Sequence, residues 1–582
     1  MRTLLRAAAA FCAAAAILAC VVPGARAADE TITVTTLEDV RDFSGAQRFA
    51  DLPGPDGLVS FGEAVEAANN EPGPQTIHFA IPPSEYWLIP EIALLKLEIG
   101  PFVIRDAGTT VDFRTQTAFA GDTNPAGWEV GVYGLEPNGW GVAAILLLAN
   151  DCTLIGLDDV HLRGQAVEIW GSGNRIQSFT TDGPLHSAIG VKGTFGGASA
   201  DGNLIGGTGP GEGNVVSGGG AGISITGPAD GNVVIGNTCL GSPFAGISVV
   251  AATRYGVFAR GNRIGGSAPG EGNWVAGNGS VGEEGYPVGV QIQVDDADST
   301  IVEGNTVGTT ADGLADYPVQ RGPGGINVVN SRDTLVRRNL VSGILQVGGG
   351  HYAGQRFGVG ISVSGVSTGT RIVGNRLGVD ATGENPIPNV VGIQVSPFTA
   401  RDLPTRTVIG GKSAAQGNVI AFSEREGIRV DGLVSSVAIR ANSIYGNGAL
   451  GIELATFAGL LGPTPNDAGD ADTAGGNGLQ NFPVIEKAAT RGALTGAKGR
   501  LDSTPMATFR LEFFASPECD ASGFGEGRDF LGTTTVTTDA NGAATFRVPL
   551  ASVAPSGFVM TATAANVATG ETSEFSPCVR IR

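Results

Sequence analysis

The sequence predicts an all-β solenoid, in which the short strands of successive coils stack into long sheets. A four-residue phrase recurs eight times: Gly, a branched apolar residue, a polar or small residue, and a second apolar residue. Its copies lie at 222–225, 246–249, 289–292, 325–328, 360–363, 392–395, 427–430 and 451–454. Because strand side chains alternate between faces, the two apolar residues of each copy should point inward and the residue between them outward.

A second phrase, Asn followed by a short strand, alternates strictly with the first. One Asn precedes each copy, at Asn214, Asn237, Asn273, Asn305, Asn339, Asn375, Asn418 and Asn442. Such alternation indicates a repeat architecture whose units bury a core only by stacking. We expect these Asn side chains to stack at a tight turn, bonding one another and the backbone in a left-handed conformation that Asn tolerates. Their predicted role is structural.

Composition supports a coiled chain and limits the partners. The chain has 582 residues, of which 92 are Gly, which suits several sharp turns per coil. Its net charge is −20, and removal of residues 1–27, with three Arg and no acid, makes it −23. A protein this acidic repels polyanions unless a cation bridges them, so no nucleic-acid partner is predicted.

Residues 1–27 are predicted to be a secretory signal peptide. Its parts are a charged start with Arg2 and Arg6, an apolar core at 7–22, and an A-x-A cleavage site at 25–27. A loose lipoprotein box at 17–20 is the alternative, but the apolar run continues past it. No later stretch is long and apolar enough to span a membrane. The predicted location is secreted, periplasmic or at the cell surface.

Four cysteines remain after cleavage. Cys519 and Cys578 lie in the last 65 residues and are expected to pair in an oxidising compartment. Cys152 and Cys239 are separated by at least two repeat units, which places them about 10 Å or more apart on one wall. Since this exceeds the reach of a disulfide, we expect two buried free thiols.

The N-terminal part predicts a strand at 31–36 and one amphipathic helix. Ser60 and Glu63 have the spacing of a capping box. The apolar stripe of the helix consists of Phe61, Ala64, Val65 and Ala68. Such a helix ahead of a solenoid should cover the open end of the apolar core and block edge-to-edge pairing.

The same residues resemble a known module. The runs TITVTT at 31–36, SFGEAVEAAN at 60–69 and GPQTIHF at 73–79 are similar to the N-terminal module of secreted bacterial β-helix proteins, named for a Cys-Ser-Leu-Arg-Glu-Ala run. This chain keeps Ser60, Glu63 and Ala64, has Phe61 and Gly62 in place of Leu and Arg, and lacks the Cys.

The repeats extend this resemblance. Ile-Gly-Gly at 205–207, 264–266 and 409–411 reaches its Asn after the same six residues. Such phrases are typical of right-handed parallel β-helix repeat proteins with the pectate-lyase-like fold. The resemblance covers roughly residues 31–480. It implies a cap with the first coils at 28–125 and a right-handed parallel β-helix at 126–461.

Beyond the repeats the pattern changes. Residues 462–480 are rich in Gly, Pro and Asp and are predicted to be a linker. Residues 481–582 hold alternating strands separated by turns, which predicts an antiparallel β-sandwich. This part is similar to a C-terminal module common in the same secreted family, and we interpret it as an accessory domain.

Repeat spacing locates a candidate site. From each Asn to the next Gly-apolar phrase the gaps are 8, 9, 16, 20, 21, 17, 9 and 9 residues. The extra residues fall in four consecutive coils, so the loops should form a wall midway along the solenoid. A wall beside a flat strand face makes a cleft. The candidate residues on these loops are Glu283, Glu284, Asp316, Arg321, His351, Tyr352, Arg356 and Asp380.

Two chemistries fit these side chains. Elimination from a uronic acid needs a base for the C5 proton and a cation for the carboxylate, and His351 or Tyr352 with Arg356 or Arg321 would supply them. Hydrolysis needs two carboxylates flanking the glycosidic bond, with Glu283, Glu284, Asp316 and Asp380 as the pool. Spacing singles out no pair, and the Asn-Thr-Asp and His-Gly motifs of polygalacturonase-like hydrolases are absent.

The strand face beside the wall is expected to bind substrate. Its outward residues would be Gln291, Asn327, Ser362 and Gln394, an uncharged ladder suited to a sugar chain, although an ordinary solvated surface has the same composition. Asp295, Asp296 and Asp298 follow the first of these strands, and three close carboxylates could bind Ca²⁺. A polar turn is the alternative interpretation.

The sequence therefore supports two functions. One is a secreted protein that recognises, and in one version cleaves, an extracellular polysaccharide as a lyase or glycoside hydrolase. The other is a non-catalytic surface or matrix protein, such as an adhesin or spacer. The glycan and the oligomeric state are left open.

Overall fold

A computed structural model describes residues 30–582 apart from 44–45, 72, 135–142, 160, 163, 184–185, 194–198, 252–255, 283, 285, 320–321 and 457–458. The predicted signal peptide lies outside the described residues. Across this described part, no helix has the length and apolar character needed to cross a membrane.

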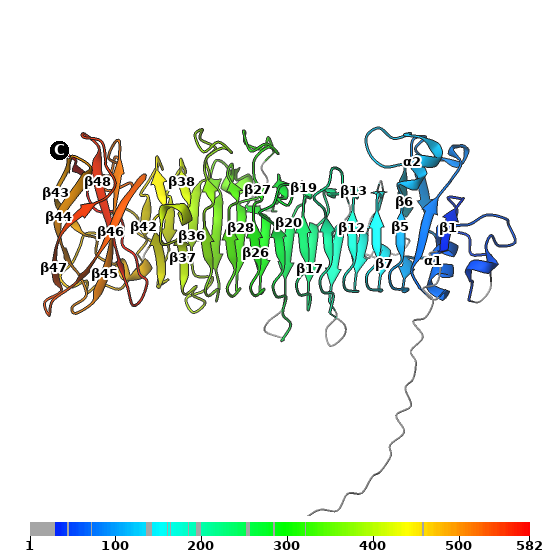
Figure 1. The fold of residues 1–582 in the computed structure, drawn as a ribbon, viewed down its shortest axis with the longest axis horizontal. Helices are drawn as coiled ribbons and strands as arrows, with labels where there is room; N and C mark the ends of the chain where they lie inside the picture. The colour runs from blue at the N-terminus through cyan, green and yellow to red at the C-terminus, as the bar shows by residue number, and fades with distance from the viewer. Residues whose placement is uncertain are drawn as a thin grey trace, which may run out of the picture.

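The body of the molecule is a parallel β-helix with three long sheets, as the repeats predict (Figure 1). Sheet 1 contains β1 (Glu30–Val34), β2 (Gln75–Phe79), β5 (Thr110–Asp112), β8 (Thr153–Ile155), β12 (Arg175–Gln177), β15 (Leu204–Gly206), β18 (Val233–Ile235), β21 (Arg263–Gly265), β26 (Ile301–Glu303), β29 (Leu335–Arg337), β34 (Arg371–Val373), β37 (Thr407–Gly410) and β40 (Val437–Arg440). Sheet 2 contains β4 (Phe102–Ile104), β7 (Ala143–Leu147), β11 (Gln165–Ile169), β14 (Ile189–Lys192), β17 (Ala221–Thr226), β20 (Ala245–Val250), β25 (Val290–Asp295), β28 (Gly324–Val329), β33 (Val359–Ser364), β36 (Val391–Val395), β39 (Ile428–Val430) and β42 (Ile452–Leu454). Sheet 3 contains β9 (Asp158–Asp159), β13 (Thr180–Asp182), β16 (Val215–Ser217), β19 (Thr238–Leu240), β22 (Trp274–Ala276), β27 (Thr306–Val307), β30 (Leu340–Val341), β35 (Arg376–Leu377), β38 (Val419–Ala421) and β41 (Ser443–Tyr445).

Each regular coil runs from sheet 1 through sheet 3 to sheet 2. The apolar residues of the recurring phrase lie in sheet 2, where Ile223 pairs with Ile247 and Ile247 with Ile292. These side chains are fully buried and belong to one hydrophobic cluster that continues along the whole solenoid. Three further strands, β3 (Ala93–Lys96), β6 (Val130–Gly134) and β10 (His161–Leu162), form a small parallel sheet near the N-terminal end.

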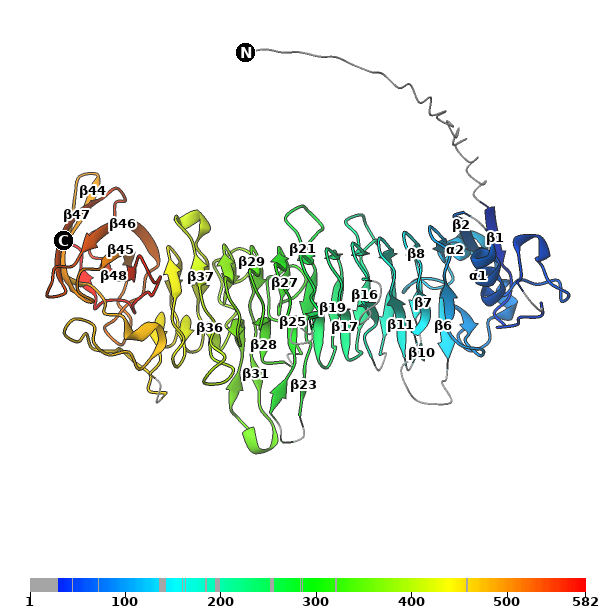
Figure 2. The same cartoon turned by 90° about the horizontal axis from the view of Figure 1, so that it is seen from below.

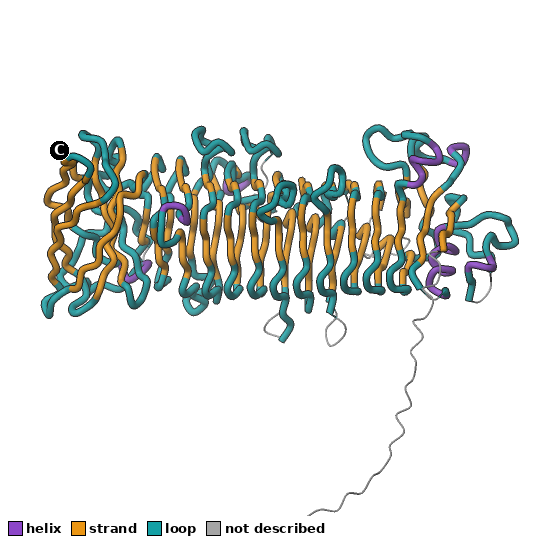
Figure 3. Tube along the Cα trace, viewed as in Figure 1, coloured by secondary structure: helices purple, strands orange, loops and turns teal. Residues whose placement is uncertain are grey.

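The N-terminal helix covers the first coils, as predicted. Helix α1 (Phe61–Asn70) begins with a complete capping box between Ser60 and Glu63. The Phe61 ring lies 4.5 Å from that of Phe102 and 5.5 Å from that of Phe79, so the helix packs onto the core. A second helix, α2 (Thr115–Ala120), lies nearby, and Figure 3 shows both at this end. Short 3₁₀ turns lie at Phe49–Asp51, Pro83–Glu85, Gly350–Tyr352, Ala414–Gln416 and Gly476–Leu479.

The eight recurring asparagines form one unbroken ladder between sheets 1 and 3. The backbone N–H and side-chain amide of Asn305 both donate to Asn339 Oδ1, at 2.9 and 3.0 Å, and the same pair of bonds joins every neighbouring couple from Asn214 to Asn442. The structural role is confirmed, but the conformation was mispredicted. None of the eight Asn residues has a positive φ; in five of the eight coils the left-handed residue is the one before the Asn, as at Arg338 (φ 56°) and Ala441 (φ 51°), whereas Gly417, before Asn418, has φ −66°.

A second ladder was not predicted from the sequence. It lies just before the sheet 1 strands, where the backbone N–H of Asn174, Asn203 and Asn232 donates to the next Asn, ending at Asn262. In later coils this position is taken by Thr300, Thr334, Thr370 and Thr407, all buried. Because the residue type changes midway, no single letter recurs along the chain to mark the ladder.

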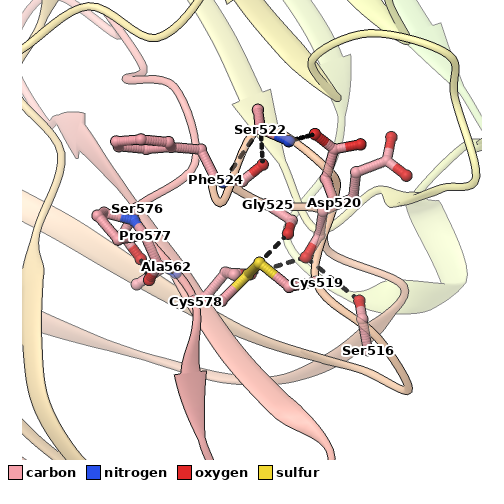
Figure 4. The surroundings of a disulfide bond; sticks show 12 residues. Ser516, Cys519, Asp520, Ser522, Phe524, Gly525, Ala562, Ser576, Pro577 and Cys578 are labelled. Carbon is pink, nitrogen blue, oxygen red and sulfur yellow. Dashed lines mark hydrogen bonds between the residues drawn. A yellow bond between two sulfur atoms is a disulfide. The ribbon is translucent and has the colours of Figure 1, made fainter.

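The C-terminal part contains two antiparallel sheets that share one hydrophobic cluster. Their strands are β43 (Val484–Arg491), β44 (Leu494–Asp502) and β47 (Ala543–Leu550) in one sheet, and β45 (Thr508–Ser516), β46 (Asp529–Thr537), β48 (Val559–Asn566) and β49 (Val579–Arg580) in the other. Cys519 and Cys578 form the predicted disulfide (Figure 4), with their Cα atoms 6.0 Å apart. Cys152 and Cys239 are buried free thiols, as predicted.

The C-terminal part also closes the solenoid, a role the term accessory does not cover. Its carboxylates accept hydrogen bonds from the last coil. Glu512 accepts from the N–H of Ala441 at 2.7 Å, and Glu574 accepts from the N–H of Leu454 at 3.1 Å. Glu526 accepts from the N–H of Asn447 at 3.2 Å and from its side-chain amide at 2.7 Å. These donors end the stack and would otherwise be unpaired.

Candidate functional site

The four long loops lie on one side of the solenoid, as the spacing predicts. They occupy 277–289, 308–323, 342–358 and 378–390, and each connects sheet 3 to sheet 2 in consecutive coils. We call them the loop wall. Hydrogen bonds join them: Ala381 N–H donates to the Gly313 carbonyl at 2.8 Å, and His351 N–H donates to the Glu284 carbonyl at 3.1 Å. The loops therefore form one surface.

Two loops of the wall project as hairpins. Strands β23 (Ser280–Val281) and β24 (Pro287–Val288) form one, and β31 (Gln346–Val347) and β32 (Arg356–Phe357) form the other. Figure 2 shows them extending together from the body of the molecule. Each returns directly into a sheet 2 strand, β25 and β33 respectively, so the hairpins flank the sheet 2 face.

The hairpins carry a cluster of rings that we call the aromatic shelf: Tyr286, His351, Tyr352 and Phe357. The Tyr286 ring lies 5.3 Å from that of Tyr352 and 5.0 Å from that of Phe357. The His351 ring meets Tyr352 edge-on at 5.3 Å. Tyr286 is 46% exposed and His351 is exposed, so the shelf combines packed rings with accessible surface. The structure thus brings the predicted candidates His351 and Tyr352 together with Tyr286, an expected residue of the first wall loop, and with Phe357, which the sequence did not single out.

A pocket of about 360 Å³ opens among the loops of the wall. It is lined by Leu314, Ala315, Asp316, Gly343, Leu345, Arg356, Pro386, Ile387 and Pro388, from three of the four loops. Its charged groups are Asp316 and Arg356, and the Arg356 guanidinium forms an ion pair with Glu424 at 2.6 Å. Arg356 is therefore already neutralised by a carboxylate from the next, shorter loop, which the sequence did not single out.

The outward ladder on sheet 2 is present, with one correction. Asn327, Ser362 and Gln394 are half-buried, and Ser362 Oγ donates to Asn327 Oδ1 at 2.8 Å. Gln291 was wrongly predicted to point outward. It is fully buried, and its amide exchanges hydrogen bonds with Asn278 at 2.8 and 3.0 Å. The register pairs Asn327 with Gln293, which is the outward residue of that coil.

The reason is a break in alternation at the start of each sheet 2 strand. The residue just before the first apolar position of the strand turns inward. In the preceding coil this residue is Gly246, where an added Cβ would lie 2.4 Å from the Val275 side chain and 2.6 Å from that of Asn278. Gln291 takes this position in its coil. The sequence did contain a signal for this alignment. Ile292 precedes Thr300 by eight residues, as Ile326 precedes Thr334, so the spacing aligns Ile292 with Ile326.

The predicted loop carboxylates have different surroundings. Asp380 is buried and accepts from Thr382 Oγ1 at 2.6 Å and from Asn385 Nδ2 at 2.7 Å, and these bonds hold its pKa well below the usual range. Glu284 is exposed, with its carbonyl bonded to the His351 N–H. Glu283 and Arg321 lie outside the described residues. Among the described residues, the wall presents Asp316 as the carboxylate facing the pocket.

The predicted Ca²⁺ ligands lie at and just after the end of β25 without converging. Asp295 is half-buried, and burial together with the negative charge of Asp296 raises its pKa. In the described parts of the chain, the acids whose ligand atoms lie within 4.8 Å of one another are Asp467, Asp470 and Asp472, not Asp295, Asp296 and Asp298. Calcium binding at 295–298 stays a prediction without a gathered site.

Comparisons with known proteins bear on the fold and not on the activity. No protein-family model and no curated protein sequence matches the chain. Among solved structures, the chain is similar to pectate lyase Pel9A, with 12% identity, 72% of this chain and 80% of that chain covered, and a TM-score of 0.26. It is similar to the catalytic domain of a GH87 α-1,3-glucanase, with 12% identity, 71% and 67% covered, and a TM-score of 0.33. It is also similar to PfbA, a surface adhesin of Streptococcus pneumoniae, with 10% identity, 75% and 96% covered, and a TM-score of 0.32.

Proposed function

We propose that this protein recognises an extracellular polysaccharide on the loop-wall side of the β-helix, with the aromatic shelf as its anchor. The observation that supports this proposal most is the clustering of Tyr286, Tyr352 and Phe357 from two hairpins, with ring centroids 5.0 to 6.1 Å apart. Partly exposed aromatic rings that hold one another in place offer large contact area with little loss of conformational freedom on binding.

The sheet 2 face beside the shelf supports a carbohydrate ligand. Its outward residues, Gln293, Asn327, Ser362 and Gln394, offer amide and hydroxyl groups without net charge, in register across four neighbouring strands. Neighbouring strands lie about 4.8 Å apart, so the ladder is a periodic row of donors and acceptors. A chain of hydroxylated rings can bond to such a row while one ring stacks on the shelf.

An extracellular location fits this proposal. The Cys519–Cys578 disulfide is of the kind that forms and persists in oxidising compartments. The predicted signal peptide at residues 1–27 would carry the chain there.

Binding to a panel of neutral and uronic polysaccharides tests the proposal. The variant Tyr286→Ala/Tyr352→Ala should weaken binding about tenfold or more, because burying one aromatic ring contributes roughly 1.5–3 kcal/mol. The control is Phe398→Ala, since Phe398 is 72% exposed on a turn between sheets 2 and 1. Equal affinities of the shelf variant and wild type would refute the proposal.

Cleavage is a separate question with its own readout. Reducing ends and the ultraviolet absorbance of unsaturated products should be followed together, with and without a Ca²⁺ chelator. The unsaturated product would indicate elimination and direct attention to His351, and reducing ends alone would indicate hydrolysis through carboxylates such as Asp316. Binding without either signal would assign the wall to recognition, as in the adhesin interpretation.

A further inference from the structure

The outer face of the β43–β44–β47 sheet carries a row of positive charge. The register places Lys487 opposite Lys498, and Lys498 opposite Arg547. Their neighbours Ala488, Ala497 and Val548 point the other way and are buried in the core of the C-terminal part. The three cations are exposed, so they share one solvent-facing row across all three strands.

This face is hollowed. A depression of about 810 Å³ lies over the sheet, bounded by Lys487, Lys498 and Arg547 on one side and by Arg491 and Leu494 on the other. Its floor is Ala489, Gly496 and Pro549, which stand opposite one another in the register. A Cβ on Gly496 would meet nothing closer than 3.8 Å, so small side chains keep the floor low and open.

The charge of this face is only partly balanced from within. Glu486 pairs with Lys498 at 3.4 Å and with Arg500 at 3.1 Å. Within the described residues, no ion pair connects Lys487, Arg491 or Arg547 to a carboxylate. Like charges directly opposite in a sheet are destabilising. In a chain of net charge −20, this row of cations is a local region that attracts anions.

We propose that this face, which we call the basic groove, binds an anionic polysaccharide such as a uronate or sulfated polymer. Strands about 4.8 Å apart and a four-residue rise of about 13 Å from Lys487 to Arg491 spread the cations over a length that suits several charged units of a polymer. The low floor admits a flat ring. Among its lining residues no aromatic side chain offers a base-stacking platform, which disfavours single-stranded nucleic acid.

The basic groove lies in a different part of the chain from the loop wall, so the two proposals stand separately. Affinity electrophoresis in gels containing polygalacturonate, dextran sulfate or neutral dextran tests it on the full mature chain. The variant Lys487→Ala/Arg547→Ala should lose at least tenfold in affinity for both anionic polymers. Binding by wild type should weaken steeply with added salt, because exposed charges are screened. Neutral dextran should not respond to the variant.

The control Arg401→Ala/Lys412→Ala removes the same charge from two exposed positions on the β-helix and should bind like wild type. The shelf variant Tyr286→Ala/Tyr352→Ala should keep its affinity for dextran sulfate, which is neither a neutral nor a uronic polysaccharide and so is not expected to bind the loop wall. If the shelf variant loses that affinity and the groove variant keeps it, the groove proposal is overturned and the wall proposal stands. Retention only by phosphatidylglycerol vesicles, or dimerisation lost in the groove variant, would assign the face to a membrane or a second copy and also overturn it.

Discussion

Each asparagine of the ladder satisfies two coils at once. Asn339 Oδ1 accepts both donors of Asn305, while its own amide donates to the Val302 carbonyl at 2.9 Å and to Asn375 Oδ1 at 3.0 Å. All of these groups are buried. The side chain therefore cannot be removed without leaving partners unpaired on both neighbouring coils.

Replacing Asn339 with Ala should lower the free energy of unfolding by at least about 2 kcal/mol, because each buried polar group left unpaired costs roughly 1–3 kcal/mol. Urea unfolding followed by circular dichroism measures the effect. The control is Asn541→Ala, whose side chain is exposed on a turn of the C-terminal part. If Asn339→Ala and the control unfolded at the same urea concentration, the stabilising role that we assign to the ladder would be contradicted.

Single residues also show where sequence reasoning reached its limit. The Asn ladder was predictable because one letter recurs ahead of every Gly-apolar phrase. The burial of Gln291 was not, because the run Val290–Val294 fits the phrase in two registers two residues apart, and only coil-to-coil pairing with Ile326 chooses between them. Asp380 looked like a catalytic acid, but its turn uses both of its oxygens.

At the scale of elements, the two ends of the β-helix are closed by different chemistry. Helix α1 covers the N-terminal end with apolar side chains. The C-terminal end is closed by carboxylates, and burial raises the pKa of Glu526 to about 7 and that of Glu574 to about 8. Glu453, on the last sheet 2 strand, has its pKa raised to about 7 in the same way.

These carboxyls make the closed end sensitive to pH. Glu574 holds its proton more tightly when folded than in the unfolded chain, where the pKa is the ordinary 4.5. Its contribution to stability is therefore complete below about pH 4.5 and is lost as the pH rises through about 8. We expect the melting temperature to fall across this window, and the fall to be shallower in Glu574→Gln.

The matched control is Glu486→Gln. Hydrogen bonds from Arg500 and Lys498 lower the pKa of Glu486, and the group is exposed, so it does not titrate in this window. Melting temperatures measured by differential scanning fluorimetry at several pH values compare the three proteins. If the melting temperatures of wild type and Glu574→Gln changed with pH in parallel, Glu574 would not be the source of the pH dependence.

At the scale of the whole molecule, the C-terminal part completes the solenoid. Phe514 and Phe575 belong to the same hydrophobic cluster as the β-helix core, and Leu454 bonds to a residue 120 positions away. The repeats predicted the solenoid because they are local. The closing contacts had no sequence signal, since they join single residues of one part to single residues of another.

A chain shortened to residues 28–461 should therefore expose β40, β41 and β42, the last strands of all three sheets. Open edges pair with other chains, so we expect self-association that the full mature chain does not show. Size-exclusion chromatography with light scattering measures it at several concentrations. A monomeric truncated protein with an unchanged β-rich spectrum would show that the end needs no cover.

Under tension, the coils of the solenoid would act as elements connected in series. The Asn ladder and the bonds between coils run along the long axis, so a pull on the two ends would pass the full force through every interface in turn, and coils would detach one at a time. The bond from His351 to Glu284 spans the coil between them and adds a parallel path at the loop wall. The stretch that carries the proposed glycan contact therefore has bonds that skip a coil, His351 to Glu284 and Ala381 to Gly313, in addition to those between adjacent coils.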